Sequence, residues 1–239
     1  MNINILFPVL NEELRLENGI LKTLEYMEKN IKNDYLLTIV DNGSKDATEK
    51  ISRELCSKYP NINYIQTKEK GVGTAFREGV ANNSYDIVGY MDIDLSTDVS
   101  HLSDVINIFE EDIDVAMVNG SRLNKASEMK GRKWYRNLTS RGLSFILKLT
   151  LKMKASDSIC GFKFFKRDFV ENLIKEADNT ENSWFFIIEL LIRAERKGAK
   201  IVELPVRWED DYNSTVKTGK LIKHYLKQIR RLRKQFRGK

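Results

Sequence analysis

DIVGYMDIDLS, residues 86–96, places an apolar segment directly before two aspartates that are one residue apart. The apolar part is typical of a buried strand, and side chains two apart on an extended chain point the same way. Asp92 and Asp94 can therefore converge on one divalent cation, Mg²⁺ or Mn²⁺, which takes carboxylate oxygens and bridges readily to a diphosphate. The plainer alternative is that the two aspartates cap a strand or solvate a loop.

The same tripeptide occurs again at residues 112–114 and provides an internal comparison. This copy precedes an apolar run, residues 115–118, whereas Asp92 and Asp94 follow one. Ligands of open α/β sheets bind beyond the carboxyl ends of the strands. The position favours the first copy as the site and predicts that the second is a solvated turn.

Strands alternate with amphipathic helices through the first half of the chain. We expect strands at residues 3–9, 36–40, 62–65, 86–92 and 115–118. The alternation predicts a mostly parallel central sheet with helices on both faces. Asp46 and Glu49 have the spacing of a capping box at the start of the second helix. The dinucleotide fingerprint is absent, because Phe76 stands at its third glycine position, and this argues against a hydride-transferring Rossmann enzyme.

The second half is less regular. It predicts a basic amphipathic helix over residues 132–154, a strand over 159–165 with a glycine at a close approach, a helix over 184–194 and a strand over 200–208. No glycine- or proline-rich linker divides the two halves, so we expect one domain.

The amino-acid composition indicates how large a core the chain can form and in which cellular compartment it works. Of the 239 residues, 41% are apolar, which is enough for a sizeable core. No segment approaches the roughly 20 apolar residues of a spanning helix, and the first residues resemble a strand and not a secretion signal. The two cysteines, Cys56 and Cys160, lie far apart and fit a reducing compartment. We expect a cytoplasmic protein, or one peripheral to the cytosolic face of a membrane.

The positive charge is concentrated at the C-terminus. Residues 217–239 carry ten Lys or Arg and no acid, and since the whole chain carries +6, the remainder carries −4. Apolar residues recur there at helical spacing, and a basic amphipathic helix of this kind suits an anionic membrane surface. A solvated packing helix is an alternative. Nucleic-acid binding is not expected, because the rest of the chain is acidic and carries no reading motif.

Four segments end strands at the predicted ligand edge: residues 8–12, 41–44, 70–77 and 92–96. Asp41 can accept hydrogen bonds from a ribose or a base, and Gly71 lets backbone N–H groups approach a phosphate. Arg77 can pair with a phosphate through two hydrogen bonds. Each segment alone is ordinary turn or cap chemistry, but together they predict a site for a nucleoside diphosphate.

These motifs carry a resemblance to a known family. FPVLNE at residues 7–12, VDNGSKD at 40–46, GVGTAFREG at 71–79, the 92–94 pair and GSR at 120–122 occur in the order seen in the inverting family 2 glycosyltransferases. DSICGFK at 157–163, WFFIIEL at 184–190 and ELPVRW at 203–208 are similar to the dolichyl- and polyprenyl-phosphate sugar synthases, and most of all to their glucosyltransferase branch.

The resemblance implies a GT-A fold, a nucleotide-sugar donor, a divalent metal and a lipid monophosphate acceptor. By position, the nucleotide would be held by Pro8, Asn11, Glu12 and Asp41, and the metal and diphosphate by Asp92 and Asp94. The sequence departs from the family pattern at Asn42, where a second Asp is frequent, and at Leu10, where Tyr is usual. It also lacks the transmembrane region that many relatives append.

A phosphate acceptor is already ionised at neutral pH and needs positioning more than a base. We expect it to be surrounded by cations from the second half, namely Arg122, Arg132, Arg136 and Arg141. Asp157 is the candidate for a base or a metal-shell group, with loop hydrogen bonding as the alternative. Lys163 and Lys217 are further candidates for phosphate contacts.

The sequence thus predicts a hexosyltransferase with residues 1–216 as the GT-A domain and residues 217–239 as a basic membrane-docking helix. UDP-glucose is the leading donor, with GDP-mannose or a UDP-N-acetylhexosamine, or a saccharide acceptor in envelope synthesis, as alternatives. A non-catalytic nucleotide-sugar-binding subunit is the alternative of another class, and intact Asp92 and Asp94 argue against it. A membrane-protein partner and a homo-oligomer are left open by the sequence.

Overall fold

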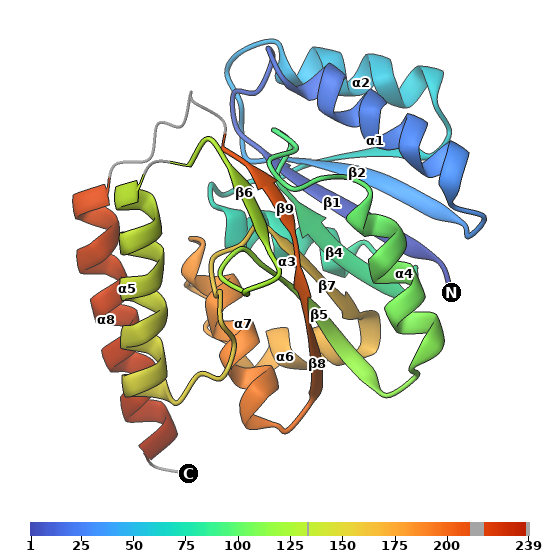
Figure 1. Ribbon diagram of the computed structural model, residues 1–239. Helices are drawn as coiled ribbons and strands as arrows, with labels where there is room; N and C mark the ends of the chain where they lie inside the picture. Colours follow the sequence, from blue (N-terminus) through green and yellow to red (C-terminus); the bar gives the residue numbers. More distant parts are fainter. Residues whose placement is uncertain (133, 211–217, 238–239) are drawn as a thin grey trace.

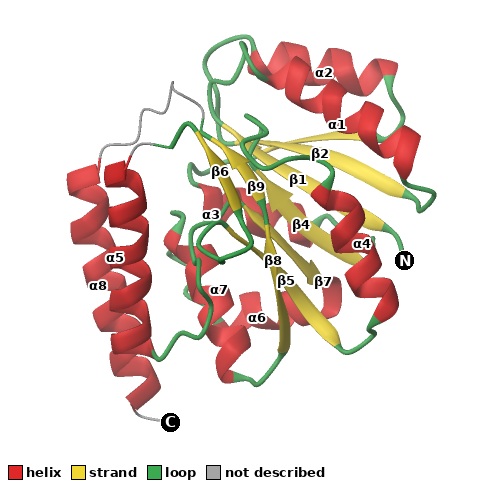
Figure 2. Ribbon diagram, viewed as in Figure 1, coloured by secondary structure: helices red, strands yellow, loops and turns green. Residues whose placement is uncertain are grey.

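A mostly parallel sheet with helices on both faces forms the body of the protein (Figures 1 and 2). The computed structural model describes residues 1–132, 134–210 and 218–237. The sheet has the order β3-β2-β1-β4-β7-β5-β8, and in it β7 alone runs antiparallel to its neighbours. Its strands are β1 (Ile3–Val9), β2 (Tyr35–Asp41), β3 (Ile62–Gln66), β4 (Ile87–Met91), β5 (Val115–Ser121), β7 (Phe162–Lys166) and β8 (Lys200–Pro205).

The helices divide between the two faces of this sheet. Apolar side chains of α1, α2 and α4 form one core with the sheet, and those of α3, α5, α6, α7 and α8 form the other. Their bounds are α1 (Leu16–Asn30), α2 (Thr48–Lys58), α3 (Val72–Ala81), α4 (His101–Glu111), α5 (Trp134–Leu151), α6 (Arg167–Glu176), α7 (Phe185–Arg196) and α8 (Thr218–Arg237). The predicted mostly parallel sheet with helices on both faces is confirmed.

The central strands explain the long apolar runs in the sequence. Every residue of β4 is buried, because β1 and β7 flank it and helices cover both of its faces. A strand buried on two faces reads as a continuous apolar run and not as an alternation. Since β1, β2 and β4 are parallel, their carboxyl ends meet at one edge, with Val9 directly beside Asp41.

A small second sheet lies over this edge (Figure 1). It consists of β6 (Glu128–Lys130) and β9 (Arg207–Glu209), which pair in parallel. The predicted strand over residues 200–208 is therefore broken in two after Pro205, whose ring nitrogen cannot donate a ladder hydrogen bond. The break brings Trp208 over the main sheet, where it bridges to Thr97 in the segment after the two aspartates.

Helices α5 and α8 pack side by side at the outer edge of the molecule (Figure 1). Tyr225, Ile229 and Leu232 of α8 are buried in this contact and against α7. The predicted boundary between residues 216 and 217 falls in a stretch outside the described residues. In the part of the chain that the structure describes, no helix is both long and apolar enough to cross a membrane.

Two local expectations have clear outcomes. Residues 112–114 precede β5 and lie at the sheet edge opposite Asp92, so the expected solvated turn is confirmed. The capping box is wrong, because α2 begins without a side-chain cap. The Asp46 carboxylate does accept a hydrogen bond from Thr48 N (3.0 Å), but Glu49 pairs with Arg53 one turn later.

Candidate active site

Asp92 and Asp94 follow the end of β4 and are half-buried. Gly161, just before β7, makes room for Asp92, since a Cβ atom there would lie 2.0 Å from Asp92 Oδ2. The predicted close-approach glycine is confirmed. Leu95 has a φ angle of 53°, which turns the chain back immediately after Asp94. The Asp94 Oδ1 atom accepts a hydrogen bond from Ser96 N (2.9 Å), which fixes the turn.

The electrostatics of the pair favour a bound cation. Burial raises the pKa of Asp92 to about 7, and the nearby charge of Asp94 adds to this shift. A divalent ion between the two carboxylates would offset their repulsion. No cluster of three or more Asp, Glu, His or Cys side chains able to hold a metal occurs in the described ranges. The pair would thus supply two ligands and leave the others to diphosphate and water, the usual arrangement for Mg²⁺.

Asp41 lies at the same edge of the sheet, at the end of β2, which is separated from β4 by β1, and is fully buried. Its carboxylate accepts hydrogen bonds from Ser44 N (2.8 Å), Ser44 Oγ (2.6 Å) and Tyr64 Oη (3.0 Å). Asn11, with a φ angle of 57°, joins the same network, because its backbone N–H donates to Ser44 Oγ and its Oδ1 accepts from Lys45 N. The loops after β1 and β2 therefore form one connected wall.

The other predicted nucleotide residues lie close to this wall. Pro8 is in β1 beside Val40 of β2. The Glu12 carboxylate accepts a hydrogen bond from Arg15 Nε (2.7 Å), and its charge reaches Asp92.

Gly71 begins the glycine loop and has a φ angle of 133°, which favours glycine. Its N–H donates to Asn42 Oδ1 (3.2 Å), and Asn42 in turn donates to the Val9 carbonyl (3.3 Å). Asn42, a departure from the family pattern, thus joins the loop to β1. All four predicted strand-end segments meet at one sheet edge.

Arg77 has a different position from the one expected of a phosphate ligand. Its guanidinium donates to the Glu181 carbonyl (3.1 Å) and to Asn182 Oδ1, and it stacks over the Phe186 ring, 4.2 Å from the centroid. A phosphate contact would require these bonds to open, so the structure revises its role to one of holding the loop before α7.

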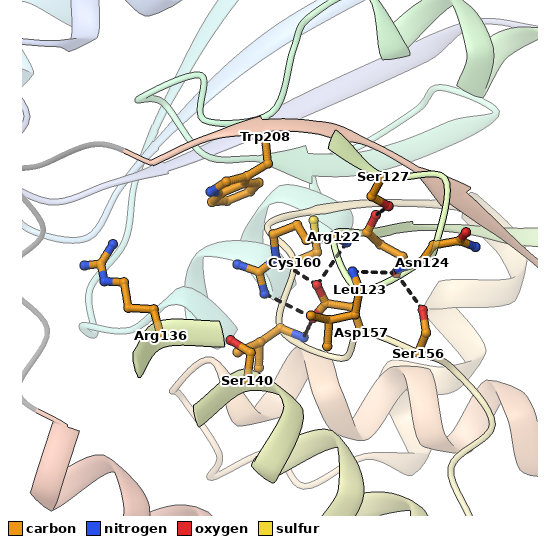
Figure 3. A network of polar contacts seen from close by, with 12 residues as sticks. Arg122, Leu123, Asn124, Ser127, Arg136, Ser140, Ser156, Asp157, Cys160 and Trp208 are labelled. Carbon is orange, nitrogen blue, oxygen red and sulfur yellow. Dashed lines mark hydrogen bonds and ion pairs between the residues drawn. The ribbon is translucent and has the colours of Figure 1, made fainter. Parts of the chain in front are cut away.

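Arg122 and Asp157 form a buried ion pair after the ends of β5 and α5 (Figure 3). Arg122 Nε donates to Asp157 Oδ2 (2.7 Å), Nη2 donates to Oδ1 (3.1 Å), and the backbone N–H of Arg122 donates to Oδ2 (3.2 Å). Trp208 covers the guanidinium, 4.7 Å from its ring centroid. The charge of Arg122 also acts on Asp92. Arg122 is therefore a fixed cation at the sheet edge.

This pairing changes the expectation for Asp157. Burial alone would raise the pKa of its carboxyl, but the charge and hydrogen bonds of Arg122 outweigh burial and hold the pKa below its usual value. A carboxylate with a lowered pKa and both oxygens engaged is a poor proton acceptor. The geometry makes Asp157 the residue that orients Arg122, and the alternative reading of a hydrogen-bonding loop residue fits better than a base.

The remaining predicted cations fall in three different settings. Arg132 and Arg136 both bind Asp210, at 3.0 and 2.9 Å, and Asp210 also accepts a hydrogen bond from Trp208 Nε1 (2.8 Å). Lys163 is fully buried and donates to the Cys160 carbonyl (2.6 Å), so a ligand cannot touch it.

Arg141 is exposed on α5, and Lys217 lies outside the described residues. Among the predicted cations that the structure describes, Arg132 and Arg136 are the ones connected to the Arg122–Asp157 pair. The connection runs through Asp210, which binds both arginines, and Trp208, which covers Arg122.

Sequence reasoning missed Asp210 and the contact that Trp208 makes. Trp208 was recognised only as part of a motif, and nothing in its spacing indicates a partner 86 positions earlier in the chain. Asp210 carries a weak signal, an acid directly after a strand near the ligand edge, of the same kind that pointed to Asp92.

Comparisons with known proteins agree with this geometry. Residues 4–174 match the family described as glycosyl transferase family 2. The chain belongs to this family. The prediction of a family 2 glycosyltransferase is thereby confirmed, and the relatives named dolichyl-phosphate β-glucosyltransferase support the predicted hexosyltransferase class.

Two relatives and one solved structure illustrate the similarity. Glycosyltransferase AglD of Haloferax volcanii is 30% identical over 212 residues, which are 87% of this chain and 33% of that protein. A dolichyl-phosphate β-glucosyltransferase of Trichomonas vaginalis is 29% identical over 237 residues, 95% of this chain and 72% of its own. The chain thus spans a third of the first relative and most of the second.

The solved structure is glucosyl-3-phosphoglycerate synthase from Mycobacterium tuberculosis in complex with UDP, with a TM-score of 0.67, 19% identity and coverage of 92% of this chain and 74% of the other. Structures of the same synthase contain Mn²⁺ or Mg²⁺ together with UDP. At this identity the likeness concerns the fold, and it confirms the predicted GT-A fold.

The raised pKa of Asp92 predicts a pH dependence of stability in metal-free protein. Between its ordinary value of 3.8 and about 7, the folded state retains a proton that the unfolded state has released. The free energy of unfolding should therefore fall as pH rises through this window, by up to about 4 kcal/mol. Urea unfolding of wild type and Asp92→Asn in chelator measures it, and the variant should lose that part of the slope.

Asp112→Asn is the matched control, because the pKa of Asp112 is lowered by Lys200 and this group is ionised in both states across the same window. It should retain the wild-type slope. Equal slopes for wild type and Asp92→Asn would contradict the assignment.

Proposed function

We propose that this chain transfers a hexosyl group, with UDP-glucose as the leading donor, to a polyprenyl or dolichyl phosphate with inversion at the anomeric carbon. The observation that carries the proposal is that Asp92 and Asp94 share one sheet edge with Asp41 and Gly71, beside the cation of Arg122. Relatives named dolichyl-phosphate β-glucosyltransferase support glucose and a lipid phosphate as the substrates.

The donor's nucleotide would bind along the wall formed by the loops after β1 and β2. Asp41 Oδ2 accepts one hydrogen bond, from Tyr64, and a carboxylate oxygen can accept a second. Because the Asp41 side chain is fully buried, a ribose hydroxyl or a base would reach it only after the residues that cover it moved aside. The rigid turn at Asn11 and the glycine loop at Gly71 would hold the nucleotide from either side. Both are fixed by hydrogen bonds before the donor arrives, which lowers the entropic cost of binding.

Breaking the bond between the sugar and the diphosphate builds negative charge on the leaving group. Asp92 and Asp94 would hold a Mg²⁺ or Mn²⁺ ion, which supplies positive charge at that point when bound. Arg122 adds a cation that is already oriented by Asp157 and Trp208, so it need not reorganise during the reaction.

The acceptor phosphate would bind on the side of the small second sheet. Arg132 and Arg136 share the single carboxylate of Asp210, which leaves a net positive charge next to Trp208. The Arg132 Nε atom is buried and has no hydrogen-bond partner. Because the phosphate nucleophile is already ionised, positioning by these cations is sufficient and no general base is required.

A membrane surface fits the outer face formed by α5 and α8. Phe145 and Leu149 on α5 are 66% and 74% exposed, and Ile222 and Leu226 on α8 are 54% and 43% exposed. Exposed lysines of α8 accompany these apolar side chains. The docking surface expected from residues 217–239 would thus also include α5, and α8 would combine docking with its observed packing.

Turnover of defined donors tests the activity. With Mn²⁺ and a short polyprenyl phosphate, UDP-glucose should give the lipid-linked glucose, and Asp92→Asn should reduce kcat/KM by about 10²–10³ because charge on the leaving group is no longer offset. Product analysis by mass spectrometry measures it. Asp112→Asn, in the second copy of the tripeptide, should retain wild-type turnover.

Other outcomes of this assay would contradict particular parts of the proposal. Preference for GDP-mannose or a UDP-N-acetylhexosamine would overturn the donor, and transfer only to a saccharide would overturn the lipid acceptor. Donor binding without turnover of any combination would identify a non-catalytic subunit. Unchanged turnover in Asp92→Asn would contradict the proposed site.

Vesicle sedimentation tests the docking face. The double variant Phe145→Glu/Leu149→Glu should lose most of its binding to vesicles with anionic lipid, because two exposed apolar anchors become charged. Leu14→Glu changes an equally apolar side chain, 92% exposed beside α1, and should bind as wild type does. Equal binding of all three proteins would contradict docking through α5.

A further inference from the structure

Residues 178–183, which connect α6 to α7, lie between the glycine loop and helix α8 and contact both. We call this segment the bridging loop. None of its residues was expected to take part in the site, and the proposed function assigns it no role.

On one side, the bridging loop shapes the glycine loop. The backbone N–H of Gly73 donates to the Asn182 carbonyl (2.9 Å), and Asn182 Nδ2 donates to Glu69 Oε2 (3.0 Å). A Cβ atom at Gly71 would lie 2.0 Å from the Asn182 carbonyl oxygen, so the two backbones are in direct contact. The conformation of the glycine loop therefore depends on where Asn182 sits.

Arg77 strengthens this contact from within α3. It donates to the Glu181 carbonyl and to the Asn182 side chain, while Phe186 of α7 supports its guanidinium plane. The interaction of a guanidinium with an aromatic face and two acceptors is strongly directional. The bridging loop is thus held against the start of α3 by backbone, side-chain and stacking contacts together.

On the other side, the bridging loop is tied to α8. The buried carboxylate of Glu181 lies 2.8 Å from His224 Nε2, and Ser183 Oγ lies 3.2 Å from the same nitrogen. Arg231 Nε lies 3.2 Å from Asp178 Oδ2. Two residues of α8, two turns apart, therefore hold both ends of the bridging loop.

Arg231 also pairs with Glu189 on α7, which is fully buried. The Glu189 carboxylate accepts hydrogen bonds from Arg193 Nε (2.8 Å) and from the Asp178 backbone N–H (3.3 Å). Glu189 thus has two arginine partners, Arg193 on its own helix and Arg231 on α8. Removing one member of such a buried network leaves a charge uncompensated, so the network resists rearrangement.

We propose that Arg231 and His224 of α8 are positioning residues for the donor: acting through the bridging loop, they hold the glycine loop in the shape that binds the nucleoside diphosphate. This inference rests on the proposed nucleotide-sugar binding at Gly71. It gives the basic helix a second role, in the donor site, that is independent of any membrane.

The test compares two adjacent arginines of the same helix. Arg231→Gln removes the contacts to Asp178 and Glu189, whereas Arg230→Gln removes an equal charge from an exposed position. Calorimetry with UDP and Mn²⁺, without lipid, should show affinity about 5- to 30-fold weaker for Arg231→Gln and unchanged for Arg230→Gln. Arg231→Lys should recover part of the loss.

Steady-state kinetics separate positioning from a general loss of structure. Arg231→Gln should raise the KM for the donor and leave the KM for the acceptor and kcat unchanged. If Arg231→Gln does not fold, His224→Ala provides the same comparison at a half-exposed position and should weaken UDP binding in the same direction.

Equal UDP affinity in the position-231 and position-230 variants, or equal increases in both KM values, would overturn the inference. Failure of wild type to bind UDP would instead overturn the proposed function, so the two failures are distinguishable.

Discussion

The structure depends on keeping two carboxylates, Asp92 and Asp94, at the end of a strand that is buried on both faces. Like charges in such a place repel each other and are poorly hydrated, which is why the pKa of Asp92 rises to about 7. The surrounding residues provide space and positive charge for the two carboxylates. Gly161 leaves space for the Asp92 carboxylate, and positive charge comes from Lys163 in the adjacent strand β7 and from Arg122 after β5. A divalent cation would offset the negative charge that remains on the two carboxylates, and the cation would in turn bind a diphosphate.

The antiparallel strand β7, which is inserted in an otherwise parallel sheet, brings further residues to this edge. It runs between β4 and β5, so its first residues lie at the carboxyl ends of both. Asp157 and Gly161 therefore reach the site from the segment that precedes β7, while Arg122 reaches it from the end of β5. The ion pair between Arg122 and Asp157 lies at this edge, and Trp208 and Asp210 connect it to Arg132 and Arg136, where we propose that the acceptor phosphate binds.

Sequence patterns predicted the strands, helices and strand-end segments of this site better than the side-chain contacts between them. Periodicity and the motifs at strand ends predicted the sheet, the two helix layers and the edge where Asp41, Gly71 and Asp92 meet, because these follow from local rules and strand direction. They did not predict that Arg77 would turn towards residues 181–182, or that Asp157 would bind Arg122, since both contacts join residues far apart in the chain. The capping box failed because Glu49 has a better partner in Arg53.

A direct measure of the central claim is the binding of Mn²⁺ followed by electron paramagnetic resonance, with and without UDP. Two carboxylates alone give an incomplete coordination sphere, so the ion should bind weakly to the free protein and at least about tenfold more tightly when a diphosphate completes the sphere. Asp94→Asn should remove most of that gain. Equally tight binding without UDP, or the same gain in Asp94→Asn, would contradict the claim that this pair and the diphosphate hold the cation together.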